Sequence, residues 1–190
     1  MTEFAKSHPY WHAKRIVENE PIVEFIHLSF YIYRPQSLID ERSIHPVARA
    51  DFLNPAFVTE FIASCPAERD VAFHSNVKCI DGISRHFPMV DMSTGAKAHL
   101  EKLKSFLDSE TYYGFVWFDS GRSFHGYGSR LIQHDEWISH MGQLLLSNQK
   151  DLKPTVDPRW IGHRLIAGYS ALRWSKNTSH YLKMPHILSH

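Results

Sequence analysis

The turn within the segment FVWFDSGRSFHGYG carries the residues of this chain that are best suited to chemistry on phosphate groups. Ser120 and Gly121 mark the turn, where a glycine lets backbone amides approach an anion closely. Arg122 can pair with phosphate oxygens, and His125, two residues after Ser123, can donate to a phosphate from the following strand. This combination suits a triphosphate, although a plain hairpin with a strand histidine is the simpler interpretation of the segment taken alone.

Two aspartates flank this segment along the chain. Asp91 lies near the end of an apolar run, where an acidic side chain can point out of a sheet into a cleft. A cap for the helix that follows is an equally good interpretation of Asp91. Asp157 precedes a proline, a pattern that is common in ordinary turns. Neither carboxylate identifies a function by itself. Only the order and spacing of all three segments can indicate one.

The elements that must position these residues follow from β-branched and aromatic runs and from apolar residues at helical spacing. The run IVEFIHLSFYIY is typical of a long, mostly buried strand. Residues 36–66 are interpreted as a connection followed by a short helix that begins near Pro55. The predicted strands cover residues 22–33, 71–77, 86–92, 112–118 and 123–132, and further helices are predicted over 97–107 and 136–146.

The fold predicted from these elements is α+β, with a mostly antiparallel sheet and flanking helices. The strands on either side of the Ser-Gly turn are expected to pair as a hairpin. Residues 156–185 contain turn signals among apolar stretches, and their pattern fixes no secondary structure. The chain has 190 residues and no convincing linker or internal repeat, so residues 1–190 are predicted to form one domain.

Composition excludes some classes of protein and leaves others open. The apolar and aromatic content is that of a folded chain, and 21 Lys and Arg against 20 Asp and Glu neither indicate nor exclude a nucleic-acid partner. Cys65 and Cys79 lack the close pairing of zinc or redox motifs, and no run approaches a membrane span, so we expect a cytoplasmic protein without membrane contact. A transition-metal site on the 14 histidines is an alternative, but no histidine pair has helical spacing beside a carboxylate.

Taken together, the three segments resemble the catalytic core of the archaeo-eukaryotic primase superfamily. Members carry an acidic pair at a strand end, a Ser-x-His strand after a Ser-Gly turn, and a third aspartate after an apolar residue. The matching segments are PMVDMS with Asp91, SGRSFHG with Ser123 and His125, and TVDP with Asp157. ALRWSKNT resembles the late arginine-containing strand of the family, and the resemblance covers about residues 87–177.

This resemblance implies a primase-polymerase, RRM-like core and a metal-dependent nucleotidyltransferase that joins nucleoside triphosphates on a single-stranded DNA or RNA template, as in DNA replication. It implies catalytic roles for Asp91, His125 and Asp157, with Mg²⁺ or Mn²⁺ held by the two aspartates. A chain this short also implies a helicase, nuclease or other accessory protein as a partner. The residues implied in nucleotide binding are Arg122, Ser123, His125, Arg164, Arg173 and Lys176, with Ser175 and Asn177 near the nucleotide or template.

One departure from the family pattern matters for activity. Ser93 stands where the family usually has a second acidic residue, two positions after the first. A serine hydroxyl is at best a weak neutral ligand, so two dications would be held less well, and Asp119 on the hairpin is a candidate substitute. Two hypotheses therefore follow: an active nucleotidyltransferase, or a catalytically degenerate primase-like module that binds nucleotide or nucleic acid within a larger complex.

Overall fold

Two antiparallel sheets form the centre of the computed structural model, which describes residues 5–188. The larger sheet has the order β2-β1-β3-β4, and β8 pairs with β3 beside it. Its strands are β1 (Val23–Tyr31), β2 (Arg42–Ala48), β3 (Asp70–Cys79), β4 (Ser84–His86) and β8 (Ala171–Arg173). The smaller sheet has the order β5-β7-β6-β9, and its strands are β5 (Met89–Asp91), β6 (Val116–Asp119), β7 (Phe124–Tyr127) and β9 (His186–Ile187).

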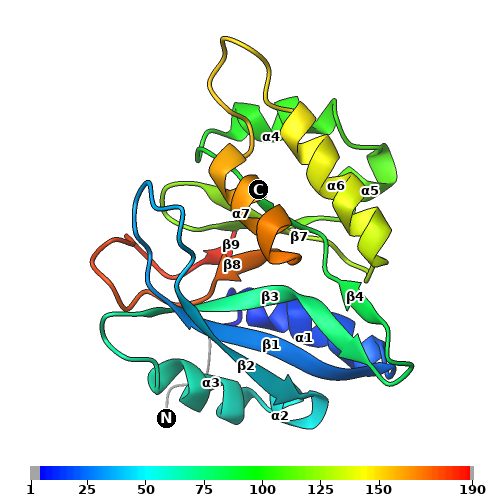
Figure 1. The fold of residues 1–190 in the computed structure, drawn as a ribbon, viewed down its shortest axis with the longest axis vertical. Coiled ribbons are helices and arrows are strands. Elements are labelled where there is room, and N and C mark those ends of the chain that lie inside the picture. The colour runs from blue at the N-terminus through cyan, green and yellow to red at the C-terminus, as the bar shows by residue number, and fades with distance from the viewer. Residues whose placement is uncertain (1–4, 189–190) are drawn as a thin grey trace.

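Helices lie against both sheets. Figure 1 shows α1, α2 and α3 beside the larger sheet and α4, α5 and α6 at the opposite end of the molecule, with α7 near the level of the smaller sheet. The helices of the described residues are α1 (Tyr10–Asn19), α2 (Arg49–Leu53), α3 (Pro55–Ala63), α4 (Lys97–Lys104), α5 (Ser109–Tyr113), α6 (His134–Leu146) and α7 (Pro158–Ala167).

The smaller sheet has the topology that the sequence pattern predicted. Strand β5 leads through α4 and α5 to β6, and β6 continues through the Ser-Gly turn into β7 as an antiparallel hairpin. In space β7 lies between β5 and β6, the order of a split β-α-β unit. The predicted α+β fold with antiparallel pairing and flanking helices is confirmed, and so is the hairpin, but the strands form two sheets where one was predicted.

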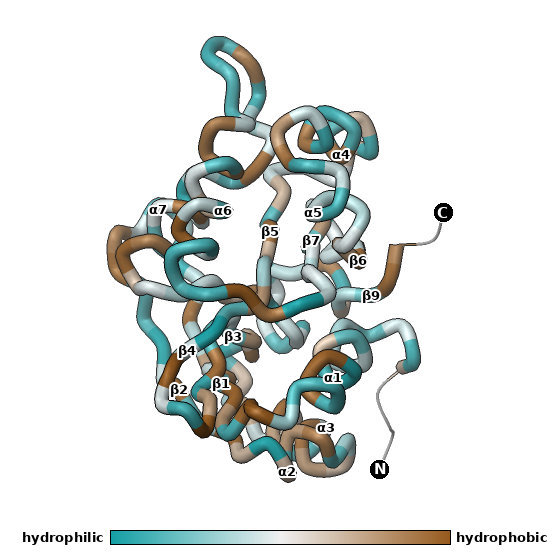
Figure 2. The backbone as a smooth tube through the Cα atoms, turned by 90° about the vertical axis from the view of Figure 1, so that its right-hand side faces the viewer, coloured by the Kyte–Doolittle hydropathy of each residue, from teal (hydrophilic) through white to brown (hydrophobic). Residues whose placement is uncertain are grey.

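Apolar side chains gather in two main cores. In the first core, Phe73 on β3 stacks on Trp174 with ring centroids 4.5 Å apart, and both are fully buried. In the second core, α6 buries Trp137 and Met141. Figure 2 shows apolar stretches on β1, α1 and α3, which contribute buried side chains to the first core. This core also includes Met89, Phe118 and Tyr127 of the smaller sheet, so it packs the two sheets against each other.

Residues 156–185, which the sequence pattern left unassigned, contain α7 and β8. Asp157 caps α7, because its Oδ1 accepts hydrogen bonds from the amides of Arg159 and Trp160 at 2.8 and 3.2 Å. The helix ends at Gly168, whose φ of 78° lies in the left-handed region that favours glycine. The Asp-Pro pair therefore begins a helix in this chain.

Strand β2 was not predicted, and the interpretation of residues 36–66 as connection plus helix is wrong over Arg42–Ala48. Pro46 within this stretch argues against a strand inside a sheet. Strand β2 lies at the edge of the larger sheet, where a missing N–H on the solvent side removes no ladder hydrogen bond. The helix predicted from Pro55 is confirmed as α3, with the Asn54 side chain accepting from the amide of Ala56 at 3.1 Å.

The strand predicted over residues 86–92 is divided between the two sheets. Strand β4 ends at His86 in the larger sheet, and β5 begins at Met89 in the smaller one. Pro88 lies between them and has no N–H to continue a ladder, so the chain changes sheets at this point. The change delivers Asp91 to the smaller sheet.

The strand predicted over residues 112–118 is wrong at its start, because Tyr112 and Tyr113 are the last residues of α5. The Asp108 side chain accepts from the amide of Thr111 at 2.9 Å and caps this helix. A capped helix turn thus overrides the strand preference of two aromatic residues. Strand β6 begins at Val116.

Asp70 fixes the segment that follows β8. Its side chain is 1% exposed, and its Oδ1 accepts from the hydroxyl of Ser175 at 2.6 Å and from the amide of Asn177 at 2.8 Å. Its Oδ2 accepts from the hydroxyl of Thr178 at 2.6 Å. Bonds from one buried carboxylate therefore hold residues 175–178 against the start of β3.

We expect Asp70→Ala to lower the free energy of unfolding by about 3 kcal/mol, since the substitution leaves several buried donors unpaired. Thr178→Ala removes only one side-chain donor to this carboxylate and should cost about 1 kcal/mol. Urea unfolding of the two variants beside the parent protein measures both values. Equal losses for the two variants would contradict this role of the carboxylate.

Candidate functional site

A short backbone pairing brings the two predicted aspartates together. The amide of Asp157 donates to the carbonyl of Asp91 at 2.9 Å. Next to it, Met92 and Val156 form an antiparallel bridge, and the amide of Ser93 donates to the carbonyl of Thr155 at 3.1 Å. The end of β5 therefore pairs with the residues just before α7, and the two carboxylates leave the backbone side by side.

Ser93 strengthens this pairing with its side chain. Its hydroxyl donates to the carbonyl of Pro154 and lies 3.3 Å from the carbonyl of Thr155. The residue that stands in place of the second acidic ligand is thus bonded to the opposite backbone. It positions Asp157 relative to Asp91 and adds no negative charge.

The β5–β7 register places the Ser-x-His strand beside Asp91. Asp91 and His125 are direct partners in the ladder, and His125 Nε2 lies 3.6 Å from Asp91 Oδ1. The hydroxyl of Ser123 lies 3.4 Å from the same carboxylate oxygen. The structure therefore brings together all three residues predicted as catalytic, Asp91, His125 and Asp157, from three separate segments of the chain.

The turn between β6 and β7 is tight and internally bonded. Gly121 has a φ of 108°, which an L side chain rarely adopts. The side chain of Asp119 accepts from the amide of Gly121 and from Lys183 Nζ, both at 2.8 Å. The carboxylate of Asp119 is thus occupied in holding the turn, and the proposal that it replaces a missing metal ligand finds no support in this geometry.

These residues line a cleft of about 600 Å³, which we call the Asp91 cleft. Residues from both sheets, the β1–β2 loop (residues 32–41), α7 and the segment after β8 contribute to it. Its charged lining consists of six arginines and three aspartates: Arg34, Arg42, Arg122, Arg159, Arg164, Arg173, Asp40, Asp91 and Asp157. The chain is close to neutral overall, so this excess of arginine makes the cleft locally suited to a polyanion.

The nucleotide-binding residues predicted from the sequence fall into two groups. Arg122, Ser123, His125, Arg164 and Arg173 all line the Asp91 cleft. Lys176 is exposed and lies outside the cleft lining, while Ser175 is bonded to Asp70 and Asn177 lines a different pocket.

Arg173 is a fixed cation behind the turn. Its guanidinium donates to the carbonyls of Ser120 at 2.7 Å and Lys183 at 3.1 Å, and also to that of Ser175. It lies 4.0 Å from the ring centroid of Tyr181. Because only 5% of Arg173 is exposed, its charge acts on the cleft mainly through the field and not by direct contact.

Sequence reasoning missed the wall of the cleft that residues 31–42 provide. Tyr33 in this wall stacks on His180 with ring centroids 4.2 Å apart, and Tyr31 and Tyr181 share a hydroxyl hydrogen bond of 2.6 Å. The N-terminal third of the chain offers no motif, so its only signal was the density of Tyr and Arg around Pro35.

The surroundings of Asp91 favour its protonated form. Burial and, next, the charge of Asp157 raise the pKa of Asp91 to about 8, against the opposing effect of Arg173. Burial and the charge of Arg173 lower the pKa of His125 to about 3. His125 is therefore neutral at physiological pH and can act as a hydrogen-bond donor.

Two carboxylates that repel each other in a buried cleft are suited to a hard cation between them. Mg²⁺ in phosphate-handling sites is held by one or two carboxylates and completed by water and substrate phosphates. Asp157 Oδ1 is used in capping α7, so its Oδ2 is the oxygen left for a ligand. Within residues 5–188 no group of three or more His, Cys, Asp or Glu gathers around a potential metal position, so the donor set fits one ion better than two.

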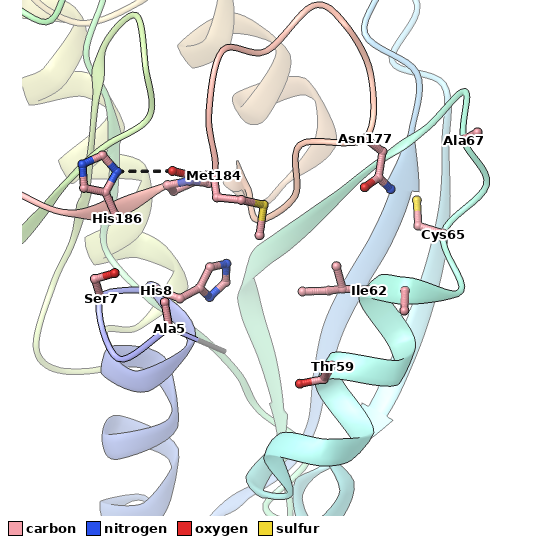
Figure 3. Close-up of a pocket in the computed structure, with 12 residues that line it drawn as sticks. Ala5, Ser7, His8, Thr59, Ile62, Cys65, Ala67, Asn177, Met184 and His186 are labelled. Carbon is pink, nitrogen blue, oxygen red and sulfur yellow. Dashed lines mark hydrogen bonds between the residues drawn. The ribbon is translucent and has the colours of Figure 1, made fainter. Parts of the chain in front are cut away.

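A second, larger pocket of about 690 Å³ lies between the residues before α1, α3 and residues 184–186, as Figure 3 shows. Its lining is mostly apolar and contains no aspartate, glutamate, arginine or lysine. Volume alone would favour this pocket as the functional site, but the charged side chains of the Asp91 cleft favour that cleft.

The two sheets and the arginine-rich cleft, with its pair of aspartates and His125, define a primase-like α+β core. A family model described as archaeo-eukaryotic primase 1D-like matches residues 49–186, well over half of the chain, and the chain belongs to this family. No curated protein and no solved structure matches the chain. None of the helices within residues 5–188 has both the length and the apolarity needed to cross a bilayer.

The raised pKa of Asp91 predicts a specific dependence of stability on pH. Between the ordinary aspartate pKa and about 8 the folded state holds a proton that the unfolded state has lost. The free energy of unfolding therefore falls as pH rises through this window, by at most about 1.4 kcal/mol per pH unit. Asp91→Asn removes this titration, so the variant should gain stability relative to the parent protein as pH rises.

Urea unfolding between pH 5 and pH 9 in the presence of a chelator measures this difference. Asp81→Asn is the matched control, because a hydrogen bond from Arg85 lowers the pKa of Asp81 and keeps its titration below this window. If the difference in free energy of unfolding between Asp91→Asn and the parent protein does not change with pH, the raised pKa of Asp91 is contradicted.

Proposed function

We propose that this chain is a metal-dependent nucleotidyltransferase that joins nucleoside triphosphates on a nucleic-acid template. The observation that carries the proposal is the convergence of Asp91, Asp157 and the Ser-x-His strand in one arginine-lined cleft. Family membership supports a module of the primase and nucleotidyltransferase type. A single-stranded template, an accessory helicase or nuclease and a cytoplasmic location stay predictions from the family resemblance.

Asp91 and Asp157 would hold the divalent ion, Mg²⁺ or Mn²⁺. When bound, the ion would neutralise the triphosphate and lower the pKa of an attacking hydroxyl. Asp91 must lose its proton before it can serve as a ligand, so ion binding should release a proton at neutral pH. Ser93 contributes by keeping the two carboxylates in register through its backbone bonds.

The hairpin would hold the triphosphate. Arg122 is exposed in the lining of the cleft and would pair with phosphate oxygens. The hydroxyl of Ser123, just before β7, and the neutral imidazole of His125 on β7 would donate to them. The buried charge of Arg173 lies behind the turn and stabilises negative charge that develops during transfer. The exposed Tyr33–His180 stack at the same cleft offers a surface for a base.

A second candidate function is a catalytically degenerate module that binds nucleotide or nucleic acid within a larger complex. The observation that favours it is the engagement of Ser93 and Asp119 with the backbone and with Lys183, which leaves only two carboxylates for metal ions. Two carboxylates can hold one ion and a triphosphate without placing a second ion on the attacking hydroxyl.

Incubation with a primed single-stranded template, labelled nucleoside triphosphates and Mn²⁺ separates the two functions. The proposal predicts extended product, lost in Asp91→Ala and Asp157→Ala and reduced about a hundredfold in His125→Ala. Arg122→Ala should act mainly on KM, because its exposed side chain contributes binding that is similar in ground and transition states. Asp81→Ala, which lies outside the cleft, is the control.

Nucleotide affinity measured on the same variants decides the remaining outcomes. Nucleotide binding without product under any condition supports the degenerate module. Absence of product, of nucleotide binding and of single-stranded nucleic-acid binding would overturn the two candidate functions together.

A further inference from the structure

A second basic group lies in the Asp91 cleft, apart from the hairpin. Asp40 in the β1–β2 loop accepts from Arg42 through two hydrogen bonds of 2.7 and 2.8 Å and pairs with Arg164 on α7 as well. All three side chains line the cleft. We call them the Asp40 group, and they place two guanidinium groups on one carboxylate.

The Asp40 group carries a buried net positive charge. Arg164 is 3% exposed, and its Nη1 has no hydrogen-bond partner among the described residues. Arg42 also donates to Ser29, and burial together with both arginines keeps the pKa of the neighbouring His74 well below its usual value. Burial raises the pKa of Asp40, but the hydrogen bonds and charges of Arg42 and Arg164 together outweigh this effect and bring the pKa to about 2. Two cations therefore share one permanent anion, with a donor left over.

The Asp40 group and the hairpin are held by different elements of the cleft. Against the dominant effects of burial and Asp157, the charges of Arg173 and of Arg164 both lower the pKa of Asp91. Arg173 is bonded to the hairpin at Ser120, whereas Arg164 is bonded to the β1–β2 loop. A strand-extending site must hold phosphates of the nucleotide and of the growing or template strand, so two separate basic groups suit it.

The wall that supplies Asp40 lies outside residues 49–186, the part of the chain that matches the family. The loop is fixed to α7, since the carbonyl of Ser37 accepts from Arg159 at 2.8 Å and from His163 at 3.1 Å. Figure 1 shows this loop rising beside α7. The second basic group is therefore completed by a part of the chain that the family match does not include.

We propose that Arg42 and Arg164 form a binding subsite for a backbone phosphate of single-stranded nucleic acid, with Asp40 as the internal anion that holds both arginines until the phosphate binds. Arg164 thereby serves the strand and not the triphosphate that sequence reasoning assigned to it. The inference rests on the proposed function, because it assigns the second phosphate of the same reaction. The planar fork of a guanidinium matches the geometry of phosphate oxygens.

Two substitutions with opposite expected signs test the subsite on the full chain. Arg42→Gln should weaken binding of a labelled single-stranded oligonucleotide of about 16 nucleotides by about tenfold. It should also reduce the slope of log K against log salt concentration by about 0.7, the value for one phosphate contact on a single strand. Asp40→Asn removes the internal anion and should tighten binding by about fivefold, with a steeper slope.

Arg85→Gln and Asp81→Asn are the matched controls, because they change the same charges in an ion pair outside the cleft. Neither control should change oligonucleotide affinity by more than about twofold. The two substitutions are expected to change oligonucleotide affinity in opposite directions. A variant with a damaged fold would bind more weakly, so loss of folding cannot produce the tighter binding expected for Asp40→Asn.

Nucleotide affinity of the same variants distinguishes failure of the subsite from failure of the proposed function. The subsite predicts that Arg42→Gln and Asp40→Asn change oligonucleotide affinity more than triphosphate affinity. Equal changes for both ligands would assign the group to the triphosphate and overturn the proposal, as would an unchanged salt slope. Oligonucleotide affinity that falls in Arg42→Gln and rises in Asp40→Asn, without any triphosphate binding, would support the subsite and contradict the proposed function.

Discussion

The antiparallel pairing of residues 91–93 with residues 155–157 determines where both carboxylates of the cleft lie. One amide-to-carbonyl hydrogen bond joins Asp157 to Asp91, and the hydroxyl of Ser93 adds a side-chain bond to the facing backbone. Pairing within a sheet leaves little freedom in register, because a shift by one residue would turn each side chain to the opposite face. The cap that Asp157 provides to α7 fixes the same carboxylate from its other side.

This arrangement makes the ionised form of Asp91 unfavourable in the folded protein. Burial and the neighbouring charge of Asp157 disfavour the ionised form of Asp91, and the folded protein bears that cost in the absence of a cation. Such a conflict between stability and charge is typical of sites organised for a ligand. Arginines on two sides of the cleft reduce the conflict only in part and leave positive charge available to anions.

The sequence predicted the residues whose position depends on local pairing. The β6–β7 hairpin and the β5 strand could be read from aromatic and apolar runs, and their register then places His125 next to Asp91. The function of Ser93 could not be read in this way, because its partner lies across the pairing with residues 154–155. The Asp40 group was missed for the same reason: its ion pair to Arg164 joins a polar loop without periodicity to a helix far along the chain.

The most direct test is a crystal structure of the protein with Mn²⁺ and a non-hydrolysable nucleoside triphosphate. Our account predicts one Mn²⁺ bound by Asp91 and Asp157, with the triphosphate against Arg122, Ser123 and His125. Triphosphate density in the apolar pocket of Figure 3, or Mn²⁺ away from both aspartates, would contradict it.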